Sequence, residues 1–212
     1  LTPHFGRSQI TGLARLAGRA VGVLANDTRF YAGAMTAHGA QKVRRFVDLC
    51  DTFHLPMVSF VDEPGFMIGL DAERAATIRH GTTALFAVQQ SSVPWASVIV
   101  RKAFGVAAAA HFGPEGLVLS WPSAEGGALP IEGGVAVAFR REIAAAEDPA
   151  ALRAELEEEV AARRTPFPRA ESVSVNDLID PRQTRRTLCD WMDWTESPLR
   201  QQLGPRSYTF RP

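Results

Sequence analysis

ASVIVRKAFGVAAAAHFGPEGLVLSW, residues 96–121, is the stretch that decides the fold. Residues 96–105 form an apolar run of strand length that ends at Gly105, and a run of small residues with high helix propensity follows it. A Gly-Pro turn comes next, and a second strand-like run covers residues 117–121. This order predicts a repeated β–α unit.

The same alternation extends in both directions along the chain. Apolar runs predict further strands at 20–26 and 56–62. Helical periodicity predicts helices at 40–53, 71–92, 133–146, 148–164 and 180–195, with Asp71 and Asp148 as N-caps. Residues 165–175 contain two prolines and predict a loop, and residues 196–212 predict a mobile polar tail. The fold class is therefore α/β.

Composition limits the classes of function. The chain has 212 residues, enough for one domain, and its 23 basic and 23 acidic side chains give no net charge with which to bind nucleic acid or an anionic membrane. We expect no membrane span and a cytoplasmic location. Cys50 and Cys189 predict reduced packing residues. The chain begins at Leu1 within a polar segment, which predicts a piece of a longer chain.

Side-chain motifs for catalysis are scarce. There is no phosphate-binding glycine loop, no GxSxG and no HExxH, and the five histidines do not have metal-ligand spacing, so we expect no metal site. Asp62 and Glu63 precede Pro64-Gly65, where they would act either as catalytic carboxylates or as caps of the strand end. The local pattern favours the capping role.

Backbone groups offer another chemistry. A strand that ends in Gly105 and opens directly into a helix presents unpaired N–H groups at one point, which suits an anionic oxygen. The alternative is that Ala107 to Ala110 only allow close helix packing, and local sequence alone favours that alternative.

Longer segments carry a resemblance to a known family. VDEPGFMIG (61–69) and the run from IRHGTTALFAVQQ to AFRREI (78–143) resemble the carboxyltransferase (β) subunits of biotin-dependent acyl-CoA carboxylases, such as propionyl-CoA carboxylase. LAGRAVGVLAND (16–27) and VNDLIDPRQTRR (175–186) extend the similarity, which covers residues 11–190. The part matched is the C-terminal half of the family's chain. The resemblance implies a crotonase-like spiral of ββα turns and an N-terminal half that this sequence lacks.

The resemblance also implies a reaction and its partners. In the family, carboxybiotin on a carrier protein and an acyl-CoA give biotin and a carboxyacyl-CoA. Loss of carbon dioxide leaves an anion on the ureido oxygen, this anion takes the α-proton of the thioester, and the resulting enolate attacks the carbon dioxide. Each active site lies between the N-terminal half of one subunit and the C-terminal half of another. The resemblance therefore implies a homo-oligomer, a biotin carboxylase partner, and a chain that is incomplete as an enzyme without its N-terminal half.

Site residues follow from the same resemblance. The family's AYGGA backbone hole for the biotin oxygen falls on Phe104, Gly105, Val106 and Ala107, with the N–H groups of Val106 and Ala107 as donors. Two loops resemble segments beside the biotin and acyl sites, and the alternative for each is a plain structural turn. Their residues are Ala32 and Gly33 in the first loop and Pro64, Gly65 and Phe66 in the second.

Three positions depart from the family pattern. Val106 stands where the family has a second Gly, which predicts a strained backbone at this β-branched residue. Ala109 replaces an acidic residue of several members, and Ile68 replaces a proline. These changes keep two alternatives open: a non-catalytic assembly or binding subunit of the same fold, and another crotonase-fold enzyme acting on CoA thioesters, such as a decarboxylase.

Overall fold

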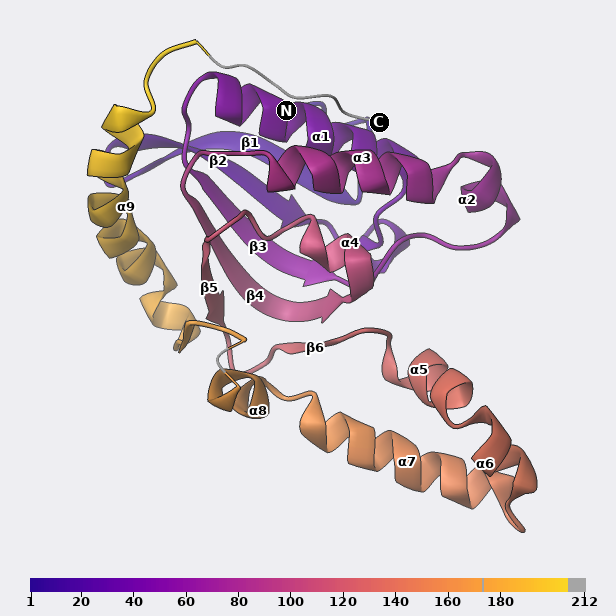
Figure 1. Cartoon of the computed structure of the whole chain (residues 1–212). Coiled ribbons are helices and arrows are strands. Elements are labelled where there is room, and N and C mark those ends of the chain that lie inside the picture. The colour runs from indigo at the N-terminus through magenta and orange to yellow at the C-terminus, as the bar shows by residue number, and fades with distance from the viewer. Residues whose placement is uncertain (173, 206–212) are drawn as a thin grey trace.

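A mixed sheet forms the body of the protein in the computed structural model, which describes residues 1–172 and 174–205 (Figure 1). In these residues the strands lie in the order β1-β2-β3-β4-β5-β7, and β6 pairs with the C-terminal part of β4. β1 and β2 form an antiparallel hairpin, and the other strand pairs are parallel. The strands are Gln9–Leu16, Arg19–Asn26, Met57–Glu63, Trp95–Phe104, Leu117–Ser120, Glu125–Gly127 and Asp177–Leu178.

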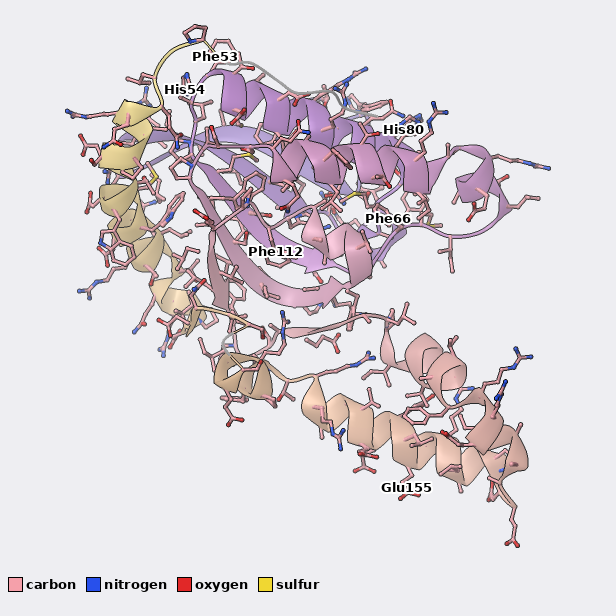
Figure 2. The ribbon with its side chains drawn as sticks, viewed as in Figure 1. Phe53, His54, Phe66, His80, Phe112 and Glu155 are labelled. Atoms are coloured by element: carbon pink, nitrogen blue, oxygen red, sulfur yellow. The ribbon has the colours of Figure 1, made fainter. Side chains whose placement is uncertain are left out.

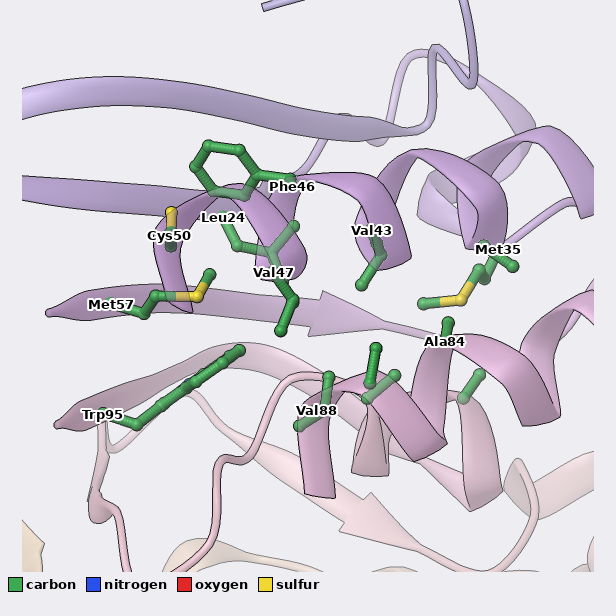
Figure 3. Packing of buried hydrophobic residues seen from close by; sticks show 14 of the residues in the cluster. Leu24, Met35, Val43, Phe46, Val47, Cys50, Met57, Ala84, Val88 and Trp95 are labelled. Atoms are coloured by element: carbon green, nitrogen blue, oxygen red, sulfur yellow. The ribbon is translucent and has the colours of Figure 1, made fainter. Parts of the chain in front are cut away.

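Helices cover both faces of this sheet. α1 (Ala37–Thr52) and α3 (Thr77–Gln89) pack side by side on one face (Figure 1). Their apolar stripes bury a core whose members come from both helices and from β2, β3 and β4 (Figure 3). On the opposite face, α9 (Thr184–Gln201) buries Leu188, Trp191 and Met192 against the strands. Because both faces are covered, the central strands are apolar along most of their length.

An arm of helices extends from the body after β6 (Figure 1). It consists of α5 (Ile131–Ala138), α6 (Arg140–Ala145) and α7 (Pro149–Arg163), and α8 (Pro166–Glu171) leads the chain back to the sheet. Asp148 caps α7 as predicted, because its carboxylate accepts hydrogen bonds from the N–H groups of Ala150 and Ala151.

The predicted strands at 20–26, 56–62, 96–105 and 117–121 are confirmed, and β1, β6 and β7 are additions. Residues 9–16 mix polar and apolar side chains and give no continuous apolar run, but they pair with β2 along its whole length. The predicted loop at 165–175 is wrong in part, because α8 begins at Thr165 as N-cap with Pro166 at its start, where a missing N–H costs no helical bond.

Several predicted helices have different limits. The helix expected at 71–92 is broken at Ala76, which has a left-handed φ of 57°, so α2 (Leu70–Arg74) and α3 are separate and Gly69, not Asp71, is the N-cap of α2. The helix expected at 133–146 is two helices that meet at Phe139. The expected tail begins too early, since α9 continues to residue 201, and residues 206–212 lie outside the described residues.

Both cysteines are free, as predicted. The Cys50 sulfur lies against Gly22, where a Cβ would collide with it. Burial raises the pKa of the Cys50 thiol to about 12, and the neighbouring Asp51 carboxylate adds to this shift. None of the helices in the described part of the chain is long and apolar enough to cross a membrane.

We predict that the two thiols differ in reactivity. At pH 8 the buried Cys50 should be alkylated by iodoacetamide much more slowly than the half-buried Cys189, because the thiolate is the reactive form and burial makes it rare. Mass spectrometry of peptides from a time course measures both rates. In denaturant the two rates should converge; equal rates in the folded protein would contradict the buried position of Cys50.

Candidate active site

A pocket of about 1610 Å³ lies where β4 ends. Its walls come from the segment 103–109, the loop 64–68, the outer face of α3 and the arm helix α5. The lining is apolar: Thr82 and Arg169 carry the polar side chains among the described residues that line it. Phe66 and Phe112, which Figure 2 labels on the body of the protein, are among the residues that line it. Such an apolar cleft with few polar groups is typical of a ligand site.

The turn from β4 into α4 (Gly105–Ala109) forms one end of this pocket. Gly105 has a φ of 61°, and a Cβ there would lie 3.1 Å from the Ala128 carbonyl oxygen, so both the conformation and the space favour glycine. The N–H groups of the first helical turn, including those of Val106 and Ala107, have no partners within the helix.

The predicted strain at Val106 is wrong. Val106 lies inside α4 and is not among the residues with positive φ, because Gly105 alone makes the left-handed turn. Val106 is 61% exposed and lines the pocket, whereas Ala107 is buried and belongs to the core cluster that includes residues of α1 and α3. A β-branched residue therefore fits at 106 without cost to the backbone. Val106→Gly would relieve no strain.

Most of the predicted site residues meet at this pocket. Phe104, Gly105, Val106 and Ala107 line it together with Pro64, Gly65 and Phe66, and so do the divergent positions Ile68 and Ala109. Ala32 and Gly33 do not line it. They lie in the 3-10 turn η1 (Tyr31–Gly33), where Gly33 packs against the back of the 64–66 loop: a Cβ there would be 2.8 Å from the Asp62 carbonyl oxygen and 3.5 Å from Pro64 Cδ.

Phe66 owes its position to a glycine on the neighbouring helix. Its ring occupies the place where a Cβ of Gly81 would be, on α3. The ring packs against the core that α1 and α3 share. Gly81 therefore has a packing role, and the 64–66 loop is held on α3 by an aromatic side chain.

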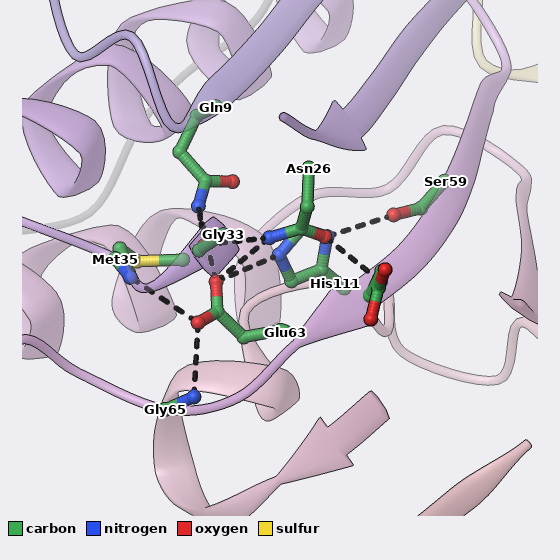
Figure 4. A network of polar contacts seen from close by, with 9 residues as sticks. Gln9, Asn26, Gly33, Met35, Ser59, Glu63, Gly65 and His111 are labelled. Atoms are coloured by element: carbon green, nitrogen blue, oxygen red, sulfur yellow. Dashed lines mark hydrogen bonds and ion pairs between the residues drawn. The ribbon is translucent and has the colours of Figure 1, made fainter. Parts of the chain in front are cut away.

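A buried carboxylate fixes the other end of this loop (Figure 4). Glu63 is fully buried, and its Oε2 accepts hydrogen bonds from Gln9 Nε2 at 3.0 Å and Asn26 Nδ2 at 3.0 Å. Its Oε1 accepts from the N–H groups of Met35 at 3.2 Å and Gly65 at 3.1 Å. One side chain thus joins β1, β2, the segment before α1 and the pocket loop.

His111, just after α4, completes this network. Its Nε2 lies 3.4 Å from Glu63 Oε2, and its Nδ1 is 3.0 Å from the Ser59 hydroxyl. The histidine is fully buried, and the sequence did not predict its polar partners because they are far away in the chain. Through Glu63 and His111 the two backbone segments at the pocket, α4 and the 64–66 loop, are tied to one buried point.

Asp62 caps a strand irregularity rather than facing the pocket. The register of β3 against β4 shifts between Val61 and Glu63. Asp62 accepts hydrogen bonds there from Lys102 N at 3.1 Å and from Arg101 Nε at 3.1 Å. The capping role that the sequence favoured for Asp62 and Glu63 therefore describes their contacts. No group of histidine, cysteine and carboxylate side chains in the described residues is arranged to hold a metal ion.

We predict that Glu63→Ala lowers the free energy of unfolding by about 3 kcal/mol or more, because it leaves several buried donors without an acceptor. Urea denaturation followed by circular dichroism measures the change. Glu159→Ala is the matched control: it removes an exposed carboxylate paired with Arg163, and surface pairs of this kind contribute about 0.3–0.5 kcal/mol. Equal stability of the two variants would contradict the structural role of Glu63.

Comparison with known proteins identifies the family. The model of the carboxyl transferase domain matches residues 1–206. The carboxyltransferase subunit of propionyl-CoA carboxylase from Haloferax mediterranei is 39% identical over 189 residues, which are 87% of this chain and 36% of that protein. The methylmalonyl-CoA decarboxylase subunit alpha of Propionigenium modestum is 34% identical over 211 residues, 97% of this chain and 40% of that protein.

A solved structure gives the same result. The transcarboxylase 12S hexamer, with methylmalonyl-coenzyme A and methylmalonic acid bound, superposes with a TM-score of 0.87 at 36% identity, over 97% of this chain and 40% of that one. The chain thus spans about two fifths of the length of these relatives. It has the crotonase-like fold of their carboxyltransferase subunits and belongs to the carboxyl transferase domain family.

Proposed function

We propose that this chain forms the carboxybiotin-binding side of an acyl-CoA carboxyltransferase, which moves a carboxyl group between biotin on a carrier protein and the α-carbon of an acyl-CoA. The observation that carries this proposal is the position of the Val106 and Ala107 N–H groups at an apolar pocket. Backbone donors in a water-poor site stabilise a developing oxyanion, and carboxyl transfer from biotin requires no side-chain nucleophile.

The pocket fits the biotin ring system. The bicycle of biotin is largely apolar, and the aliphatic and aromatic walls from the 64–68 loop, α3 and α5 suit it. Its ureido oxygen requires hydrogen-bond donors, and the first turn of α4 has donors without helical partners. Gly105 and Gly127 lie beside this turn and line the pocket with backbone atoms.

The proposed reaction also needs a second substrate and partner proteins. An acyl-CoA supplies the second substrate, and a biotin carboxyl carrier protein with its biotin carboxylase subunit supplies the carboxylated biotin. We also propose a homo-oligomer in which another copy completes each site. The related transcarboxylase 12S assembles as a hexamer, which supports assembly of this kind. Within this scheme Pro64, Gly65 and Phe66 shape the pocket, and Ala32 and Gly33 support that loop from behind.

A second candidate is a decarboxylase that runs the transfer in the opposite direction, from a carboxyacyl-CoA to biotin. The similarity to the methylmalonyl-CoA decarboxylase subunit favours this candidate. The same backbone donors would serve both directions, because the transition state is shared. Assays of carboxylation and decarboxylation distinguish the two.

We predict that Ala107→Pro in the intact protein lowers kcat for propionyl-CoA carboxylation roughly 10²–10³-fold, because proline deletes one N–H donor of the proposed site. Ala107 is in the first turn of α4, where its N–H has no acceptor within the helix, so proline deletes the donor without removing a helical hydrogen bond. The measurement combines this rate with the rate of decarboxylation of free carboxybiotin.

Ala107→Ser is the matched control, since it keeps the N–H and adds one atom. It should retain activity within a few-fold of the parent. Circular dichroism establishes that both variants are folded. If Ala107→Pro folds and keeps the parental rates in both assays, the N–H of residue 107 is not part of the site. The role of the alanines would then be close helix packing.

A further inference from the structure

Arg169 is the one charged side chain among the described residues that line the pocket. It lies near the end of α8, which brings the chain back from the arm to the sheet. Its carbonyl oxygen accepts hydrogen bonds from Ser174 N at 2.9 Å and Ser174 Oγ at 2.7 Å, and from Ser172 Oγ at 3.1 Å. These bonds fix the backbone from which the guanidinium reaches the pocket.

The guanidinium of Arg169 is buried in part, and one of its nitrogens lacks an acceptor among the described residues. Its Nη1 is inaccessible to solvent and has no hydrogen-bond acceptor. This nitrogen occupies the place that a Cβ of Gly126 would take, so the glycine in β6 makes room for it. Burial lowers the pKa of Arg169. A buried cation without a partner costs free energy, and an anion from outside the chain would offset that cost.

A second arginine reinforces the positive potential from the other face of β6. Arg164 lies against Gly127, with its Nε 3.5 Å from the place of a Cβ there, and its guanidinium is 5.5 Å from the ring centroid of Phe104. Its Nη1 is also buried without an acceptor. Gly126 and Gly127 pair with Ala103 and Phe104, the residues that lead into Gly105 and α4. Both charges therefore adjoin the end of β4, which leads into the helix α4 that carries the proposed donors.

We propose that Arg169 binds a carboxylate of the pocket's occupant. A guanidinium matches a carboxylate with two parallel N–H donors, and a single charge on the ligand balances the single charge on the lining. Phosphates carry more charge and are usually bound by several cations, whereas Arg169 is the one charged side chain in the described lining. The proposal rests on the carboxyltransferase function, in which the carboxylate belongs either to a carboxyacyl-CoA or to carboxybiotin.

The test compares ligands that differ only in the carboxylate. Calorimetry on the intact protein gives dissociation constants for methylmalonyl-CoA and for propionyl-CoA, with Arg169→Gln, Arg169→Lys and the parent. Decarboxylation of free carboxybiotin gives KM and kcat for the case in which the carboxylate belongs to carboxybiotin. Arg163→Gln is the matched control, because it removes a positive charge from the exposed end of α7, where Arg163 pairs with Glu159.

We expect Arg169→Gln to weaken the binding of methylmalonyl-CoA roughly 10- to 100-fold and to leave propionyl-CoA unchanged, if the carboxyacyl group is the ligand. If carboxybiotin is the ligand, the KM for its decarboxylation rises by a similar factor and both CoA esters bind as before. Arg169→Lys should restore part of the loss, because it keeps the charge and loses the second donor. Arg163→Gln should change none of these values.

Two results would overturn the proposal: unchanged values in all three assays, or equal weakening of both CoA esters, which would assign Arg169 to the CoA moiety or to the fold. If Arg169→Gln does not fold, Arg169→Lys decides the question. Lysine loses the bidentate contact, so this variant must weaken the binding of methylmalonyl-CoA or raise the KM for carboxybiotin while the dissociation constant for propionyl-CoA stays the same. A parent protein that transfers no carboxyl group but binds the carboxylated ester through Arg169 would refute the proposed function and leave this inference standing.

Discussion

The buried carboxylate of Glu63 is the interaction on which the arrangement of the pocket depends. It accepts hydrogen bonds from two strands, from the segment before α1 and from the pocket loop, and it lies beside the imidazole of His111. An anion in such a place is tolerated only because its hydrogen-bonded neighbours are donors. The same condition makes the network specific, because a shift of any of these segments leaves donors unpaired in the interior. The loop at Gly65 and the end of α4 are therefore positioned by one group.

The apolar character of the pocket gives its few polar groups more influence. Electrostatic interactions strengthen where water is excluded, so an apolar ligand that fills the pocket would strengthen those made by the amides of α4 and the guanidinium of Arg169. An anionic ligand would find fixed donors already in position and would not have to reorganise solvent around them. Because the lining has hardly any competing acceptors, those donors stay available. In the proposed site, the apolar walls would contact the ligand's apolar part, and the backbone and arginine groups would bind its charge.

Local sequence signals predicted the parts of the fold that depend on neighbours in the chain. The apolar strands and α1 follow from periodicity, and the β4–α4 turn was foreseen because Gly105 and the alanines are adjacent. The break at Ala76 was not, since an alanine in a left-handed conformation is dictated by the packing of α2 and α3 and has no local signature. The sequence could not predict the contacts of Glu63 because its partners are distant in the chain: Gln9 is 54 residues away and Asn26 is 37 residues away. Arg169 stood in a segment predicted as a loop, and only the return of α8 to β6 brings it to the pocket.

The two adjacent glycines of β6, Gly126 and Gly127, limit which substitutions the protein can accept. Arg169 occupies the space that a side chain at 126 would need, and Arg164 lies close to the corresponding space at 127. Two successive glycines of β6 thus separate two cations that approach the strand from opposite faces. Any larger residue at 126 would displace the guanidinium, whereas loss of the arginine would leave a void over the glycine. Positions 126 and 169 are therefore coupled. The effects of substitutions at the two sites on the free energy of unfolding should be non-additive, and either substitution should change the preference of the pocket for charged ligands.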